Sequence, residues 1–105
     1  MVLKKENIEE AIKTFRFIVV NFYANWCEHC KKMEPEYTAA AGRLRALNSS
    51  VVLAKFNVDF QESVARKLGV NGLPTTKFFA YGEEKPYEGG RKAKKILSWL
   101  QRTVP

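Results

Sequence analysis

Two cysteines three positions apart, at the boundary between two different patterns, most constrain how this chain folds. Before Cys27 and Cys30 lies a nearly continuous apolar, β-branched and aromatic run from Phe17 to Tyr23. Such a run is typical of a strand buried on both faces, in a sheet covered by helices. After the cysteines, apolar residues follow helical spacing. A cysteine pair at a strand-to-helix junction indicates thiol chemistry, provided that the surrounding chain forms an α/β unit.

Alternating strand-like and helix-like segments predict the order β-α-β-α-β-α-β-β-α. In chain order, we expect a strand at Val2–Leu3, a helix over 8–15, the strand Phe17–Tyr23, a helix from the cysteines to Leu47, a strand over 51–58, a helix over 61–68, a strand over 76–81, a hairpin strand within 83–88 and a helix over 91–102. On the last helix, the residues expected to face the core are Ala93, Ile96, Leu97 and Leu100.

Local signals predict how some of these helices begin. Asn7 with Glu10, and Asp59 with Glu62, have the spacing of N-cap pairs. Pro35 lies inside the long helix, where it removes a backbone hydrogen bond and is expected to produce a kink.

Composition places the chain among ordinary single domains. Its 105 residues are 46% apolar and 28% charged. No apolar run reaches the roughly 20 residues that cross a bilayer, so we expect no membrane association. The formal charge of +7 raises the question of nucleic acid, but the one dense basic run, Arg91–Lys95, has no interleaved aromatic residues. We interpret this run as a solvated basic face and expect no nucleic-acid partner.

The position of the cysteine pair favours thiol–disulfide exchange. In the first turn of a helix, Cys27 and Cys30 would lie on one face, close enough for a disulfide. Unpaired N–H groups and the positive end of the helix dipole stabilise a thiolate at Cys27. His29, placed between the cysteines, adds a hydrogen-bond donor or a positive charge. The expected reaction is attack by Cys27 on a substrate disulfide, followed by displacement by Cys30.

Three other interpretations of the pair remain open. A structural zinc site needs four ligands, whereas this chain offers two cysteines and one crowded histidine. A purely structural disulfide closing so small a ring would stabilise the fold by only about 2 kcal/mol. An iron–sulfur cluster shared between two chains is the third. We expect no metal and no cofactor beyond the redox-active pair.

The run FYANWCEHCKKMEPEY closely resembles the active-site segment of the thioredoxin superfamily, specifically of protein disulfide isomerase catalytic domains, usually written FYAPWCGHCK…APEY. The similarity continues in LAKFNVD, in GVNGLPTTKFF and in YEGGRKAKKILSWLQRT. It implies that residues 1–105 form one thioredoxin-like α/β domain, with a central mixed sheet sandwiched between helices. That domain is either a whole protein or part of a longer chain.

The resemblance also implies roles for residues around the cysteines. Cys27 corresponds to the exposed nucleophile and Cys30 to the buried resolving thiol. Trp26 would form part of the substrate surface. Arg91 matches an arginine that helps the buried thiol to ionise; the alternative is one more surface cation.

A proline loop completes the implied substrate surface. Leu73-Pro74, followed by Thr75, corresponds to the family's cis-proline loop, which faces the cysteines and contacts the substrate backbone. A cis bond costs little only before proline, so the sequence permits it. The alternative is an ordinary turn proline.

Three departures from the family pattern surround the site. Glu28 replaces a glycine and puts a negative charge beside the thiolate, which opposes its ionisation. Asn25 replaces a proline, which is expected to loosen the turn before Trp26. Asn21 replaces the buried acid that accepts a proton from the resolving thiol, so Lys55 would lack its usual partner. Because an unpaired buried ammonium is costly, we expect Lys55 either to be partly neutral or to be bridged by water to Asn21.

These features predict a thiol–disulfide oxidoreductase or isomerase that acts on protein disulfides during oxidative folding. The expected partners are unfolded or misoxidised proteins and an upstream thiol oxidase or glutathione, and the domain is expected to be monomeric. The resemblance implies the endoplasmic reticulum lumen, although the chain shows neither a secretory signal nor a KDEL-type tail. The alternatives are a cytoplasmic thioredoxin-type reductase and a redox-slow substrate-binding module of a larger isomerase.

Overall fold

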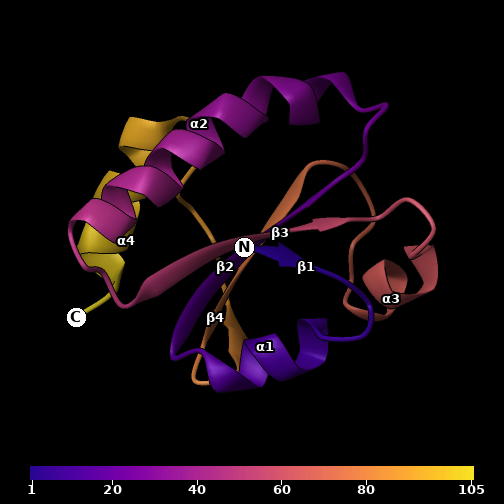
Figure 1. Cartoon of the computed structure of the whole chain (residues 1–105), viewed down its shortest axis with the longest axis horizontal. Helices are drawn as coiled ribbons and strands as arrows, with labels where there is room; N and C mark the ends of the chain where they lie inside the picture. The colour runs from indigo at the N-terminus through magenta and orange to yellow at the C-terminus, as the bar shows by residue number, and fades with distance from the viewer.

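A computed structural model describes all 105 residues and shows a five-stranded mixed sheet between two layers of helices (Figure 1). The elements, in chain order, are β1 (Val2–Leu3), α1 (Ile8–Thr14), β2 (Phe17–Tyr23), α2 (Glu28–Ala46), β3 (Val51–Asn57), α3 (Glu62–Lys67), β4 (Thr75–Ala80), β5 (Glu83–Lys85) and α4 (Ala93–Thr103). The predicted element order and the α/β class are confirmed.

The apolar run that ends before the cysteines forms β2, in the middle of the sheet order β1-β3-β2-β4-β5. β2 pairs parallel with β3 and antiparallel with β4. In this register Asn21 lies between Lys55 on β3 and Thr76 on β4. The carboxyl end of β2 leads directly into the loop that ends at Cys27, and Cys30 lies in the first turn of α2.

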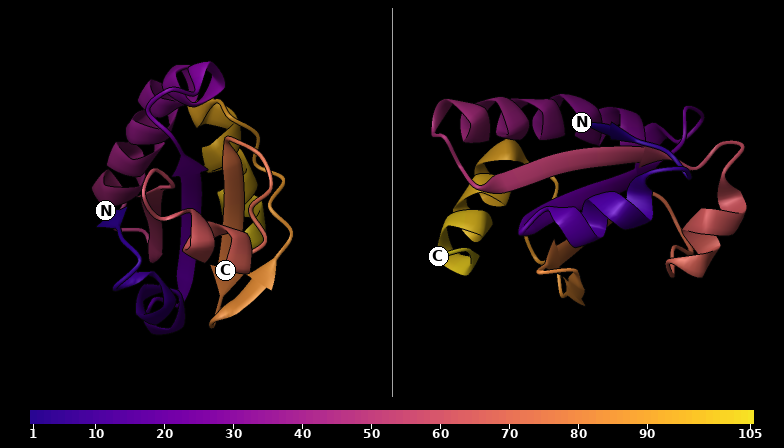
Figure 2. Two further views of the ribbon diagram at one scale, coloured as in Figure 1. Left: turned by 90° about the vertical axis from the view of Figure 1, so that its right-hand side faces the viewer. Right: turned by 60° about the horizontal axis from the view of Figure 1, so that its bottom comes forward.

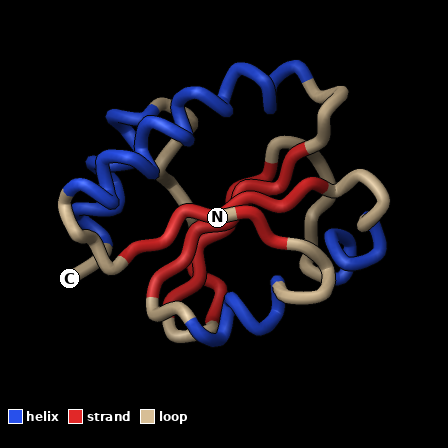
Figure 3. Tube along the Cα trace, in the orientation of Figure 1, coloured by secondary structure: helices blue, strands red, loops and turns tan.

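The two faces of the sheet bury separate apolar clusters, as a run buried on both sides predicts. α2 and α4 cover one face, and α1 and α3 cover the other (Figures 1 and 3). Viewed from below, α2 and α1 lie on opposite sides of the sheet (Figure 2, right). Along β2, Phe17 and Val19 face α2 and α4, whereas Ile18, Val20 and Phe22 face α1.

Several local predictions are corrected by tertiary contacts. On α4 the buried residues are Ile96, Trp99 and Leu100, and the aromatic Trp99 was missing from the expected set. Trp99 packs edge-on against Phe78 of β4, at 5.4 Å between ring centroids. Asn7 does not cap α1 with its side chain; its Oδ1 accepts instead from the N–H of Lys4, at 2.8 Å.

Pro35 lies within α2, which continues as one helix from Glu28 to Ala46. Its exposed side chain points away from the core. No helix of the structure is long and apolar enough to cross a membrane.

Candidate active site

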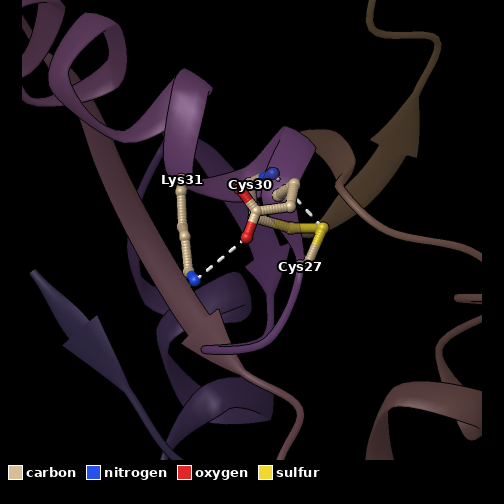
Figure 4. A network of polar contacts seen from close by, with 4 residues as sticks. Cys27, Cys30 and Lys31 are labelled. Carbon is tan, nitrogen blue, oxygen red and sulfur yellow. Dashed lines mark hydrogen bonds and ion pairs between the residues drawn. A yellow bond between two sulfur atoms is a disulfide. The ribbon is translucent and has the colours of Figure 1, made fainter.

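The cysteine pair lies at the start of α2, where β2 ends. Cys27 is the N-cap residue, and its Sγ accepts a hydrogen bond from the Cys30 N–H at 3.2 Å (Figure 4). The two residues form a disulfide, with Cα atoms 5.2 Å apart, within the range that a disulfide requires. The same N–H and the positive end of the helix dipole would stabilise the charge of a Cys27 thiolate after reduction.

The expectation that Cys27 is exposed is wrong for this oxidised form. Cys27 is 6% exposed and Cys30 is 4% exposed, so burial does not separate them. Both sulfur-bearing residues pack in the cluster that also contains Ala24 and Val58, because the Cys27 sulfur turns inward to cap the helix.

Charged residues flank the pair on its solvent side. His29 and Glu28 are both exposed. The Glu28 carboxylate pairs with the Lys31 ammonium one turn later, at 3.2 Å, and Figure 4 shows the Lys31 side chain reaching toward the start of the helix. Because Lys31 offsets part of the Glu28 charge, the opposition to thiolate formation expected from Glu28 is reduced.

A carboxylate outside the expected set holds the loop before the cysteines. Oδ2 of Asp59 accepts from the Asn25 N–H at 3.3 Å, and its Oδ1 accepts from the Trp26 indole N–H at 3.1 Å. The Asn57 side-chain amide also donates to Oδ1 of Asn25, at 3.4 Å. The expectation that Asn25 loosens this turn stays a prediction, and the Asn25 N–H, which a proline lacks, adds a hydrogen bond from the loop to Asp59.

Asp59 therefore does not cap α3 as predicted. Gln61 occupies the N-cap position and makes no side-chain cap hydrogen bond. Trp26, held by Asp59, remains 69% exposed beside Cys27.

The proline loop lies at the same end of the molecule as Trp26. The Leu73–Pro74 peptide bond is cis, as expected from the resemblance. Leu73 packs against the cluster that contains both cysteines, and with Trp26 and Val70 it lines a cavity of about 300 Å³. The Thr75 hydroxyl donates to the Gly72 carbonyl and closes the turn. Leu73 thus links the proline loop to the cluster that holds the disulfide, and Trp26 lines the cavity beside it.

The expectation of an unpaired Lys55 beside Asn21 is wrong. The Lys55 ammonium lies 3.6 Å from the Glu34 carboxylate on α2, and its side chain is 32% exposed. It also lies 5.7 Å from the centre of the Tyr23 ring. Asn21 is buried, and its Oδ1 accepts from the Thr76 hydroxyl at 3.3 Å. The acid absent from β2 is thus replaced, as the partner of Lys55, by one on the helix.

Arg91 lies beside the histidine of the cysteine motif. His29 and Arg91 line one small hollow of about 170 Å³ between the first turns of α2 and the start of α4. The loop that carries Arg91 is held by Tyr87, whose hydroxyl donates to the Gly90 carbonyl at 2.8 Å. Burial raises the pKa of Tyr87 to about 12.

Sequence reasoning missed three carboxylates of this region: Asp59, Glu34 and Glu36. Glu36 accepts from the Ala93 N–H at 2.8 Å, where α4 begins. Their partners lie between 21 and 57 positions away in the sequence, so no local spacing could reveal them. The structure contains no group of three or more His, Cys, Asp or Glu side chains arranged to hold a metal ion.

Comparisons with known proteins agree with this geometry. The sequence model of the Thioredoxin family matches residues 1–102. Protein disulfide-isomerase of Gallus gallus is 43% identical over 109 residues, covering 100% of this chain and 21% of that protein. Protein disulfide isomerase-like 1-4 of Arabidopsis thaliana is 39% identical over 104 residues, covering 99% of this chain and 17% of that protein. The chain thus spans about a fifth of the length of these curated relatives.

Solved structures show the same fold. The zinc-bound form of human ERp44 superposes with a TM-score of 0.90 at 25% identity, covering 100% of this chain and 30% of that chain. The first thioredoxin domain of mouse Protein disulfide-isomerase A4 superposes with a TM-score of 0.83 at 29% identity, covering 99% of this chain and 74% of that chain. The predicted thioredoxin-like fold is confirmed, and the chain belongs to the thioredoxin family.

Proposed function

We propose that this domain, residues 1–105, catalyses thiol–disulfide exchange on protein disulfides during oxidative folding. The observation that carries the proposal is the Cys27–Cys30 disulfide at the start of α2, with the Cys27 sulfur already accepting the Cys30 N–H. A sulfur held by a helix N-terminus is stabilised as a thiolate, and the thiolate is the reactive species.

The proposed reaction has two balanced steps. The Cys27 thiolate attacks one sulfur of a substrate disulfide, forms a mixed disulfide and releases the other substrate sulfur as a thiolate. The Cys30 thiolate then attacks the Cys27 sulfur, so the substrate leaves fully reduced and the Cys27–Cys30 disulfide forms. Reversal of both steps oxidises a substrate dithiol. In isomerisation, another thiolate of the substrate attacks the substrate sulfur of the mixed disulfide, which forms a new substrate disulfide and releases the Cys27 thiolate.

The surface around the disulfide supports protein substrates. Trp26 is largely exposed yet held by Asp59, and the neighbouring cavity has an apolar wall formed by Leu73 and Val70. An exposed aromatic beside an apolar hollow suits the unfolded segment of a misoxidised protein. An upstream thiol oxidase or glutathione would restore the oxidised pair, and the endoplasmic reticulum lumen is the compartment that fits this chemistry.

Scrambled ribonuclease tests this proposal. The wild-type domain should restore ribonuclease activity in a glutathione buffer, and Cys27→Ser should not. Cys30→Ser should accumulate a mixed disulfide with substrate, because the resolving thiolate is absent. A Cys27→Ser variant with wild-type isomerisation would refute the proposal.

A second candidate is a redox-slow substrate-binding module, which Asn21 favours. Its buried amide cannot accept a proton, and it lies where the family has an acid. The variant lacking both thiols separates the two candidates. Loss of all folding assistance supports catalysis, whereas full retention supports the binding module.

A further inference from the structure

The hollow shared by His29 and Arg91 has a predominantly basic lining. His29, Lys32, Met33 and Glu36 come from α2, and Arg91 and Lys92 come from the segment before α4. Its charged walls thus contain three permanent cations and one carboxylate. α2 and α4 pack against one another on the same face of the sheet (Figure 1).

These cations have no carboxylate partner within the protein. None of the five ion pairs in the structure includes Lys32, Arg91 or Lys92. The one carboxylate of the hollow, Glu36, is already used, because it accepts the Ala93 N–H at 2.8 Å. The first turn of α4 contains no acidic residue. Three cations against one carboxylate, which is engaged in capping α4, leave the lining of the hollow with an excess of positive charge.

The basic run noted in the sequence is divided between two places. Arg91 and Lys92 line this hollow, beside the cysteine motif. Lys94 and Lys95 line a different one, with Trp99 and Arg102. The interpretation of the whole run as an undifferentiated solvated face is therefore too simple.

We propose that this hollow binds a carboxylate carried by the thiol or disulfide that reacts at Cys27–Cys30. The inference rests on the proposed exchange function and specifies its substrates. His29, which lines the hollow, lies between Cys27 and Cys30 in the first turn of α2, so the hollow and the disulfide share one turn of the helix. A volume of about 170 Å³ admits one carboxylate-bearing group. Arginine and lysine are the donors that bind carboxylates.

Two sources provide this chemistry: glutathione, and an acidic residue beside a cysteine of a protein substrate. With glutathione, its thiolate attacks the Cys27 sulfur, forms a mixed disulfide and releases the Cys30 thiolate. A second glutathione thiolate then attacks the glutathione sulfur of that mixed disulfide. The products are glutathione disulfide and the reduced pair.

Stopped-flow tryptophan fluorescence would measure reduction of the oxidised domain by glutathione and by uncharged 2-mercaptoethanol, at low ionic strength. Lys32→Gln combined with Lys92→Gln should slow glutathione about 3- to 10-fold and leave 2-mercaptoethanol within about twofold. The matched control, Lys94→Gln with Lys95→Gln, removes the same net charge and should change neither rate more than about twofold. All four lysines are exposed, so both variants should fold.

Equal slowing in both double variants would overturn the proposal, because net charge alone would then explain the effect. No slowing with glutathione, or equal slowing with 2-mercaptoethanol, would overturn it as well. Failure of every thiol to reduce the wild-type disulfide would instead refute the exchange function, and the inference with it. Disulfide peptides with Glu or Gln beside cysteine distinguish the sources. If the wild-type domain prefers the Glu peptide and the Lys32/Lys92 variant does not, the hollow binds acidic residues of protein substrates as well as glutathione. If the wild-type domain shows no preference for the Glu peptide, the hollow binds glutathione alone.

Discussion

Replacing Asp59 by alanine should destabilise the loop that carries Trp26 and Cys27. The substitution removes two acceptors at once, one for the Asn25 N–H at 3.3 Å and one for the indole N–H at 3.1 Å. Hydrogen bonds to charged groups contribute about 1.5–3 kcal/mol each when well made. Both bonds here are solvent-exposed and one is long, so we expect about 0.5–1.5 kcal/mol for each.

The expected total is therefore a loss of about 1–3 kcal/mol in the free energy of unfolding. For a domain near this size, each kcal/mol corresponds to roughly 4–8 °C in melting temperature. Asp59→Asn should lose about half as much, because it keeps one acceptor oxygen. Urea unfolding followed by circular dichroism measures these values. Glu62→Gln is the matched control, since it removes an exposed charge that makes no ion pair in the structure.

A double-mutant cycle between Asp59→Ala and Trp26→Phe isolates the indole bond. The two losses should be non-additive by about 0.5–1.5 kcal/mol. Additive losses would refute the conclusion that Asp59 holds Trp26.

Three further outcomes follow from the structure. Burial holds the pKa of Tyr37 well above its usual range, so above about pH 10 the unfolded chain releases a proton that the native state keeps. The free energy of unfolding should then fall by about 1.4 kcal/mol per pH unit because of this group, and this loss should be absent below about pH 10. When the unfolding free energy from urea titrations is plotted against pH, the slope above about pH 10 should be shallower by that amount in Tyr37→Phe. Asn21→Glu should restore a proton acceptor and speed release of the mixed disulfide in a single-turnover reductase assay; unchanged turnover would count against the relay argument. Glu36→Ala leaves the Ala93 N–H without its acceptor and should cost about 1 kcal/mol in unfolding free energy, whereas an unaltered melting curve would show that water replaces the cap.

The fold was predictable where apolar pattern alone determines structure. The predicted strand Phe17–Tyr23 matches β2 residue for residue, since a continuous apolar run can only be buried between two layers. The cysteine positions at the start of a helix were predictable for the same reason. Helix-face assignments were less secure: Trp99, missing from the predicted core, is buried because β4 and the Tyr87 loop supply aromatic partners.

The polar arrangement of the site was not predictable from spacing. Asp59 has the position of a helix cap in the sequence, but the loop before Cys27 offers it two N–H donors. Lys55 finds Glu34 on a helix rather than an acid on the neighbouring strand. Such pairs depend on which elements, distant in the sequence, lie side by side in the fold, and local spacing in the sequence does not reveal which elements do so.

The reduction potential of the Cys27–Cys30 couple tests the central claim most directly. Stabilising the Cys27 thiolate at the start of α2, with the Glu28 charge offset by Lys31, favours the reduced form and makes the disulfide a better oxidant. Equilibration with glutathione buffers, followed by mass spectrometry of alkylated thiols, should give a value near the roughly −180 mV typical of disulfide isomerases. A value near the roughly −270 mV of thioredoxin would contradict the account and assign the domain to disulfide reduction.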